Sequence, residues 1–404
     1  MRHTKNLMMA PDIGLDRSCL RAAMIDATGV EALYVHIPFC FHKCHYCDFY
    51  SITRQTPQRM ERFVDLLLSE ADLWKRDTPL SPRTVFFGGG TPSLLPNESM
   101  RRLIVGIRER FDFSRLEEWT IEINPATADL DYLRMLRSLG VNRLSFGAQS
   151  FDPEELKILE RHHDPTDVDR SIELARRAGF ERLNVDLIYA IPGQTVDSWK
   201  RSLERALALG IDHLSCYGLT YESNTPMAVR KRLGEFEPAA DELELEMFKL
   251  ARDMLSARGI EWYEISNYAR GGQECRHNLV YWTGGNYVGI GPSAASHVEG
   301  HRFKNRPHLG EWELAVPSGD LPVVEHELLT PAQRASERVM LELRLRKGVR
   351  FADLVRYDDF NARTHYADVL SSLASLGLIA LNSEGFRLTE PGLNVADAIA
   401  GEFA

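Results

Sequence analysis

The chain has 404 residues, of which 44% are hydrophobic and 26% charged, and its formal net charge is −10. That length suits a large core plus a smaller module, and the negative charge argues against a protein that coats nucleic acid. No apolar run reaches the roughly 18–20 residues that span a bilayer. The first thirty residues contain three aspartates and lack the apolar block of a signal peptide, which predicts a cytoplasmic location.

Short apolar strands alternate with longer amphipathic segments from about residue 32 onward. Strands are expected at 32–37, 84–87, 119–123, 143–147, 182–188, 213–219 and 261–266, and helices include 62–74, 131–140 and 171–180. Regular β-then-α alternation calls for a parallel sheet. Six such units predict an α/β fold built on a partial (β/α)6 barrel.

The last eighty residues have a different pattern. Helices are expected at 337–349 and 366–381, with a hairpin over 385–393, which together indicate a small winged-helix-like α+β module. No basic block accompanies it, so nucleic-acid binding is not expected. The predicted organisation is a poorly ordered N-terminal extension (1–30), the barrel (31–270), a Gly-rich connection (271–324) and the C-terminal module (325–404).

Three of the six cysteines, Cys40, Cys44 and Cys47, follow a C-x3-C-x2-C spacing. In a reducing compartment such a cluster more often holds a metal than a disulfide, because neighbouring thiolates need a cation between them. Structural zinc would need a fourth ligand, which His42 or His45 could supply. An iron–sulfur cube would instead leave one iron open to a small chelating molecule. Inert buried cysteines are the third interpretation.

Polar groups lie where the predicted strands end, which is where a parallel barrel gathers its functional residues. Gly88, Gly89 and Gly90 follow the strand at 84–87, and their missing Cβ atoms let a ligand approach backbone N–H groups. The later strands add Glu122, Asn124, Gln149 and Asp186. Buried carboxylates need partners, so we expect these side chains to meet hydroxyls, cations or one another.

The stretch YVHIPFCFHKCHYCDF resembles the signature of radical S-adenosylmethionine (SAM) proteins, in which SAM chelates the open iron of a [4Fe–4S] cluster. Over about residues 32–400 the motifs resemble the HemN family of oxygen-independent coproporphyrinogen III dehydrogenases and its HemW-type haem-chaperone branch. The resemblance implies that the three clustered cysteines bind the cluster. It implies SAM contacts for Tyr34, Gly89 and Glu122, and a second SAM site, found in the dehydrogenases, at Tyr46, Gly90, Thr91, Gln149, Arg161 and Asp186.

Three features favour the chaperone branch. The dehydrogenases have a further cysteine two positions after the third, where this chain has Phe49, and they carry a longer N-terminal segment. In addition, the HN-x2-YW motif of the chaperone branch matches His277, Asn278, Tyr281 and Trp282. Imidazole is a competent axial ligand of haem iron, and aromatic rings pack on a macrocycle. Cys275 and His297 are alternative ligands.

The sequence therefore predicts a haem chaperone that binds a [4Fe–4S] cluster, SAM and haem and delivers haem to respiratory apo-haem proteins at the membrane. The resemblance also implies a homodimer and an electron or haem donor protein. The alternatives are a coproporphyrinogen III dehydrogenase, which would abstract hydrogen from propionate chains, and a zinc-stabilised barrel without a redox role. No catalytic residue is assigned.

Overall fold

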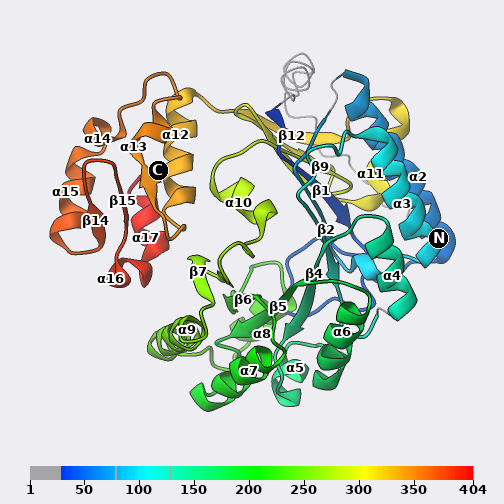
Figure 1. Cartoon of the computed structure of the whole chain (residues 1–404), viewed down its shortest axis with the longest axis horizontal. Helices are drawn as coiled ribbons and strands as arrows, with labels where there is room; N and C mark the ends of the chain where they lie inside the picture. The colour runs from blue at the N-terminus through cyan, green and yellow to red at the C-terminus, as the bar shows by residue number, and fades with distance from the viewer. Residues whose placement is uncertain (1–28, 78–79, 128, 404) are drawn as a thin grey trace, which may run out of the picture.

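A twelve-stranded sheet curves through most of the molecule in the order β12-β11-β10-β9-β1-β2-β3-β4-β5-β6-β8-β7. The computed structural model describes residues 29–77, 80–127 and 129–403, so the extension predicted over residues 1–30 lies almost wholly outside the described residues. Figure 1 shows the helices on the outside of the curved sheet and a separate C-terminal module, coloured orange to red, beside it. No helix in the described ranges is both long and apolar enough to cross a membrane.

Six consecutive parallel strands form the centre of the sheet and confirm the predicted α/β barrel. They are β1 (Ala32–Ile37), β2 (Thr84–Gly89), β3 (Glu118–Ile123), β4 (Arg143–Gln149), β5 (Arg182–Tyr189) and β6 (His213–Gly218). Each pairs in parallel with the next in chain order. The helices between them are α2 (Pro57–Asp77), α3 (Asn97–Arg110), α4 (Leu130–Ser138), α5 (Pro153–Ile158), α6 (Pro165–Arg177) and α7 (Val196–Ala208).

Helix α6 begins six residues before the predicted start at residue 171. Asp164 caps its first turn in a reciprocal capping box with Asp167, and Pro165 occupies the first helical position. Both features satisfy or remove backbone N–H groups that a helix start leaves without partners. The apolar periodicity alone missed this turn because its exposed side is polar.

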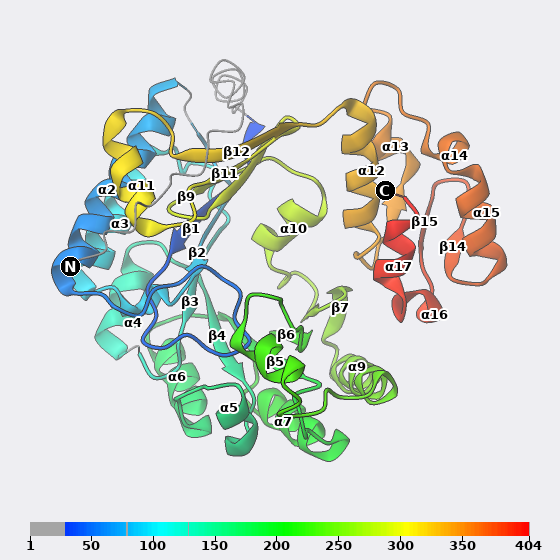
Figure 2. The same cartoon turned by 180° about the vertical axis from the view of Figure 1, so that it is seen from behind.

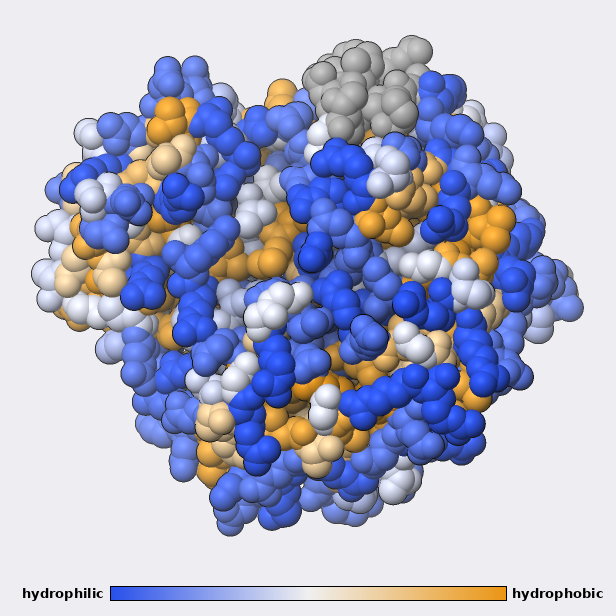
Figure 3. All heavy atoms as spheres, viewed as in Figure 1, coloured by the Kyte–Doolittle hydropathy of each residue, from blue (hydrophilic) through white to orange (hydrophobic). Residues whose placement is uncertain are grey.

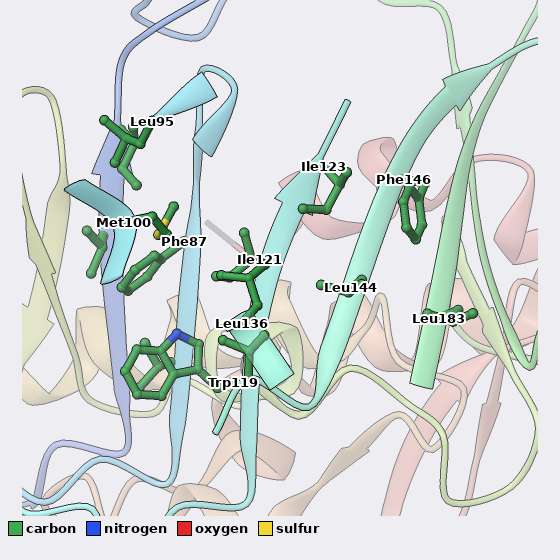
Figure 4. Packing of buried hydrophobic residues seen from close by; sticks show 14 of the residues in the cluster. Phe87, Leu95, Met100, Trp119, Ile121, Ile123, Leu136, Leu144, Phe146 and Leu183 are labelled. Carbon is green, nitrogen blue, oxygen red and sulfur yellow. The ribbon is translucent and has the colours of Figure 1, made fainter. Parts of the chain in front are cut away.

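The main core lies between the outer face of the strands and the helices. Figure 4 shows Phe87 of β2 and Trp119 of β3 packed near Leu136 of α4, and all three side chains are fully buried. Successive side chains of a strand point to opposite faces. The residues that alternate with this core set, including Glu118 and Glu122 of β3, therefore face the inside of the barrel.

The outer strands at the two ends of the sheet pair in antiparallel fashion, and the sequence predicts only one of them. The strand expected over 261–266 is β7 (Glu261–Glu264), which turns back into β8 (Asn267–Ala269), and the Glu264 carboxylate accepts the Ser266 N–H in that turn. At the other end, β9 (Tyr287–Ile290) pairs in parallel with β1 and leads to β10 (Ala295–Val298), β11 (His301–Asn305) and β12 (Val323–Leu328). Helix α10 (Arg276–Trp282) lies between the two ends of the sheet (Figure 1).

The C-terminal module has its own hydrophobic cluster, between Ala335 and Phe403. The helix predicted over 337–349 is α12 (Pro331–Glu342), and the chain then turns at Gly348, whose φ is 69°, into β13 (Val349–Arg350). The helix predicted over 366–381 is α15 (Ala367–Ser375), because Gly377, with a φ of 70°, ends it before β14 (Ile379–Leu381). The hairpin predicted over 385–393 is wrong in its bounds, because β15 (Gly385–Leu388) pairs with the preceding β14 and residues 390–393 form a short helix. The wing is therefore the hairpin of β14 and β15.

The remaining elements are short or lie at the periphery. They are η2 (Pro92–Leu94), α8 (Pro226–Arg232), α9 (Asp241–Ser256), α11 (Leu309–Ala315), η3 (Val316–Ser318), α13 (Phe351–Leu354), α14 (Ala362–His365), α16 (Glu390–Leu393) and α17 (Ala396–Gly401).

Candidate functional site

One cavity of ≈ 1430 Å³ extends inside the barrel. It is larger than the roughly 300–1,000 Å³ typical of a site for one small ligand. The three clustered cysteines line one part of it, and Asn278, Tyr281 and Trp282 of α10 line another. In Figure 2 the blue loop between β1 and α2, which carries the cysteines, crosses in front of β3 and β4. Figure 3 shows hydrophobic residues in the hollow between the C-terminal module and the barrel.

The cysteine loop follows β1 and is closed at its base by backbone hydrogen bonds. The Cys40 N–H donates to the Ile52 carbonyl over 2.9 Å, and the Ile52 N–H donates to the Pro38 carbonyl over 2.7 Å. Burial raises the pKa of the Cys40 thiol, and it raises that of Cys47 to about 11. These thiols therefore stay protonated until a metal displaces the protons.

The three thiols lie farther apart than the sulfur ligands of one tetrahedral zinc ion. A tetrahedral zinc with bonds of about 2.3 Å holds its sulfur ligands about 3.8 Å apart. The three Sγ atoms do not all lie within 4.8 Å of one another; in the described part of the chain, the group of three metal-type ligands that does is His42, Glu160 and His162. His42, a candidate fourth zinc ligand, lies 3.5 Å from Glu160 and packs its ring on His162.

The carboxyl end of β2 packs closely against the cysteine loop, and the glycines make that contact possible. A Cβ on Gly90 would lie 2.7 Å from the Phe39 carbonyl oxygen, and a Cβ on Gly89 would lie 2.4 Å from the His36 ring. The Gly89 N–H donates to the Glu122 carboxylate over 3.2 Å. The lack of Cβ atoms at these glycines thus allows close packing of the backbone, in addition to the approach of a ligand that the sequence led us to expect.

Glu122 is a carboxyl group with few partners. Burial and, to a smaller extent, the nearby Asp186 raise its pKa to about 8, and the hydrogen bond from the Gly89 N–H offsets only part of this effect. The same burial, together with Glu122, raises the pKa of Tyr34, whose hydroxyl lies 3.1 Å from Nδ1 of His36. A buried carboxyl group with a raised pKa is suited to binding the ammonium group of a ligand, because the positive charge of the ammonium would stabilise the ionised carboxylate.

Arg161 joins the cysteine loop to β4. Its guanidinium donates to the Gly147 carbonyl over 2.6 Å and lies 3.7 Å from Sγ of Cys44. Gln149, at the end of β4, has a φ of 67°, which is a strained conformation for a residue with a Cβ. Asp186 accepts hydrogen bonds from Asn184 over 2.7 Å and from Ser145 over 3.2 Å.

Eight of the nine residues predicted to bind SAM line the cavity, and Tyr34 does not. The eight are Tyr46, Gly89, Gly90, Thr91, Glu122, Gln149, Arg161 and Asp186. They lie in the same cavity as the cysteines, so the structure brings together the cluster set and the SAM set. The chain therefore offers a carboxylate, an amide and backbone N–H groups beside the thiols, a donor set that fits an amino acid derivative such as SAM.

His277 is in a different environment from the one expected of an accessible ligand. Its side chain is 1% exposed and does not line the cavity. Nδ1 lies 2.9 Å from the Thr84 hydroxyl and Nε2 lies 2.8 Å from the Tyr281 hydroxyl. Burial lowers the pKa of His277 to about 3, so the ring is neutral. A haem iron would therefore have to displace one of these two hydroxyls to reach a ring nitrogen.

The alternative haem ligands are also buried. The Cys275 thiol lies 3.4 Å from the Glu118 carboxylate, and burial raises its pKa to about 12. His297 is 8% exposed and its Nδ1 lies 3.3 Å from the Gly285 carbonyl. Neither residue lines the cavity, whereas Tyr281 and Trp282 do. The α10 part of the cavity thus offers aromatic surfaces that fit a macrocycle, while axial ligation by His277, Cys275 or His297 would require a rearrangement.

Glu118 is a site residue that the sequence did not reveal. This fully buried side chain begins β3 and accepts hydrogen bonds from the backbone N–H groups of Arg276 and His277, over 3.2 and 3.0 Å, at the start of α10. It also pairs with Arg182 at 2.8 Å. Burial alone would raise its pKa, but the charges of Arg143 and Arg182 hold it below its ordinary value. Glu118 therefore anchors the helix that carries the HN-x2-YW motif.

Comparisons with known proteins match both parts of the chain. The model of the radical SAM superfamily matches residues 34–206, and that of the HemN C-terminal domain matches residues 329–395. The protein named heme chaperone HemW from Lactococcus lactis is 31% identical over 373 residues, which cover 92% of this chain and 97% of its own. The proteins of that name from Mycobacterium tuberculosis and Bacillus subtilis are 35% and 34% identical, covering 91% and 93% of this chain and 93% and 99% of theirs.

The solved structure of coproporphyrinogen III oxidase (HemN) from Escherichia coli, described as a radical SAM enzyme, has a similar fold. Its TM-score is 0.85 at 24% identity, and the match covers 99% of this chain and 95% of that one. At this identity the likeness establishes the fold of the barrel and of the C-terminal module together.

Proposed function

From the premise that this chain belongs to the HemW family of radical SAM proteins, we propose that it is a haem chaperone. It holds a [4Fe–4S] cluster and SAM in the cysteine part of the cavity, binds haem in the α10 part, and passes haem to respiratory apo-haem proteins. One observation carries the proposal: a single cavity is lined both by the three cysteines and by Asn278, Tyr281 and Trp282. The family likewise leads us to propose a homodimer and a protein that donates electrons or haem.

The residues of the chain would act mainly by binding and positioning. When bound, the cluster supplies one-electron chemistry and an open iron. Cys40, Cys44 and Cys47 would hold it, with the Arg161 guanidinium offsetting part of the thiolate charge near Cys44. Glu122 would accept a hydrogen bond from the amino group of SAM.

Haem titration of purified variants tests the haem-binding part of the proposal. His277→Ala should weaken haem binding if His277 is the axial ligand, and His365→Ala, which changes an exposed histidine of the C-terminal module, is the matched control. Tyr281→Phe removes the hydroxyl beside Nε2 of His277 and should keep or strengthen binding. Binding by His277→Ala that equals wild-type binding would remove His277 from the ligand role. Failure of the wild-type protein to bind haem would overturn the proposal.

An oxygen-independent coproporphyrinogen III dehydrogenase is the second candidate function. It is favoured by Gln149, Arg161 and Asp186, which resemble the second SAM site of those enzymes and line the same cavity. The test is anaerobic: reconstituted protein, dithionite, SAM and coproporphyrinogen III. Catalytic formation of protoporphyrinogen would establish this activity. Iron and sulfide analysis with EPR spectra of the same sample would separate a [4Fe–4S] cluster from zinc.

A further inference from the structure

A buried cation inside the barrel has carboxylates near it but no hydrogen-bonded partner among the described residues. Arg143 begins β4, is 3% exposed and lines the cavity. Within residues 29–77, 80–127 and 129–403, no hydrogen bond or ion pair involves its guanidinium. Glu118 and Asp186 are the carboxylates that act on it electrostatically, together with Cys275 and Tyr263. Both carboxylates have other partners: Glu118 pairs with Arg182 and anchors α10, and Asp186 accepts from Asn184 and Ser145.

The imidazoles and the thiol near Arg143 carry no negative charge that could pair with its guanidinium. His213 and His277 have pKa values lowered by burial and by the charge of Arg143, so both rings are neutral. The pKa of Cys275 is raised, so its thiol is protonated. Glu118 and Asp186 thus act on Arg143 through their charge alone, and neither carboxylate accepts a hydrogen bond from its guanidinium within the described residues.

A buried guanidinium without hydrogen-bond acceptors is costly, because it stays charged at any physiological pH and presents five N–H donors. Its planar fork matches a carboxylate, which can accept two of those hydrogen bonds at once. Tyr281 and Trp282 line the same cavity and offer apolar surface to the rest of such a ligand. The chemistry of the site is thus that of a carboxylate attached to a large flat molecule.

We propose that the guanidinium of Arg143 binds a carboxylate of the molecule carried in the cavity, and that in the proposed function this carboxylate is a propionate of haem. The assignment rests on the proposed function for the identity of the ring, and on the geometry of Arg143 for the carboxylate. Arg143 is then a specificity-determining residue, which favours tetrapyrroles with free acid side chains.

The test compares haem with its dimethyl ester, which keeps the ring and the iron but removes both carboxylates. Wild-type protein should bind haem at least about 10-fold more tightly than the ester. Arg143→Met should lose this preference, and Arg143→Lys should keep part of it. Arg110→Met is the matched control and should keep the full preference, because Arg110 does not line the cavity and is paired with Asp72. The ratio of the two affinities cancels a general loss of binding in a variant.

Two results separate this assignment from the proposed function. Equal affinity of wild-type protein for haem and its ester, or an unchanged preference in Arg143→Met, would overturn the carboxylate role and leave the haem-binding function standing. Failure of wild-type protein to bind either porphyrin would overturn the proposed function, and the assignment would fall with it.

Discussion

The protonation of Glu122 should make the proposed binding of SAM depend on pH, and the size of the effect follows from the pKa of this carboxyl. The pKa of this carboxyl is raised to about 8, first by burial and then by Asp186. At pH 6 only about one carboxyl in a hundred is ionised, and at pH 8 about half are. If SAM binds the carboxylate form, the contribution of Glu122 to the affinity rises about 50-fold over that range, which is about 2.3 kcal/mol.

The measurement is calorimetric titration of SAM into the anaerobically reconstituted protein at several pH values between 6 and 8. Glu122→Gln has no carboxyl to titrate, so the ratio of wild-type to variant affinity removes the titration of SAM itself and of the cluster. That ratio should rise about 50-fold from pH 6 to pH 8. A ratio that changes less than about threefold would refute the role of the Glu122 carboxylate in SAM binding.

Three further predictions concern the framework of the site. Gly90→Ala places a Cβ 2.7–2.8 Å from backbone carbonyls at the base of the cysteine loop and should lower the iron and sulfide bound per chain, whereas Gly271→Ala, which meets nothing within 4 Å, should not. Glu118→Gln leaves Arg182 without its buried carboxylate and should lower the free energy of unfolding by about 3–5 kcal/mol in urea titrations; a loss under about 1 kcal/mol would contradict the anchor role. Burial raises the pKa of Glu70 from 4.5 to about 7, so the stability from its bound proton is present below pH 4.5 and is lost as the pH rises to about 7. Relative to Glu70→Gln, urea stability should therefore fall by about 3 kcal/mol over that range, and a constant difference would show that Glu70 does not titrate there.

The six barrel strands could be predicted because each contains a short run rich in apolar and β-branched or aromatic residues between helical patterns, which is a local signal. The strands β9 to β12 could not, because segments such as His301–Asn305 mix polar and apolar residues and become strands only by pairing with distant partners. The C-terminal helices were predicted too long, since the periodicity continued through residues that Gly348 and Gly377 turn into strands.

Some residues of the candidate site could likewise be predicted from local patterns, and others could not. The cysteine spacing and the glycine run are local patterns, and they led to residues that line one cavity. The environment of His277 depends on Thr84, 193 residues away, and the anchor at Glu118 reaches a backbone N–H 159 residues along the chain. No local pattern carries such pairings, so the burial of His277 and the role of Glu118 required the folded structure.

Two neighbouring strands each extend from a contact with α10 to the cysteine part of the cavity. β2 starts with Thr84, which holds the His277 ring, and ends at the glycines beside the cysteines. β3 starts with Glu118 under α10 and presents Glu122 four residues later, about 13 Å along the strand. A pair of hydrogen-bonded extended strands hardly stretches, so β2 and β3 fix the distance between their contacts with α10 and their carboxyl ends beside the cysteines. A ligand bound beside the cysteines and a ligand bound beside α10 would therefore lie at a fixed distance from each other, in whichever order they bind.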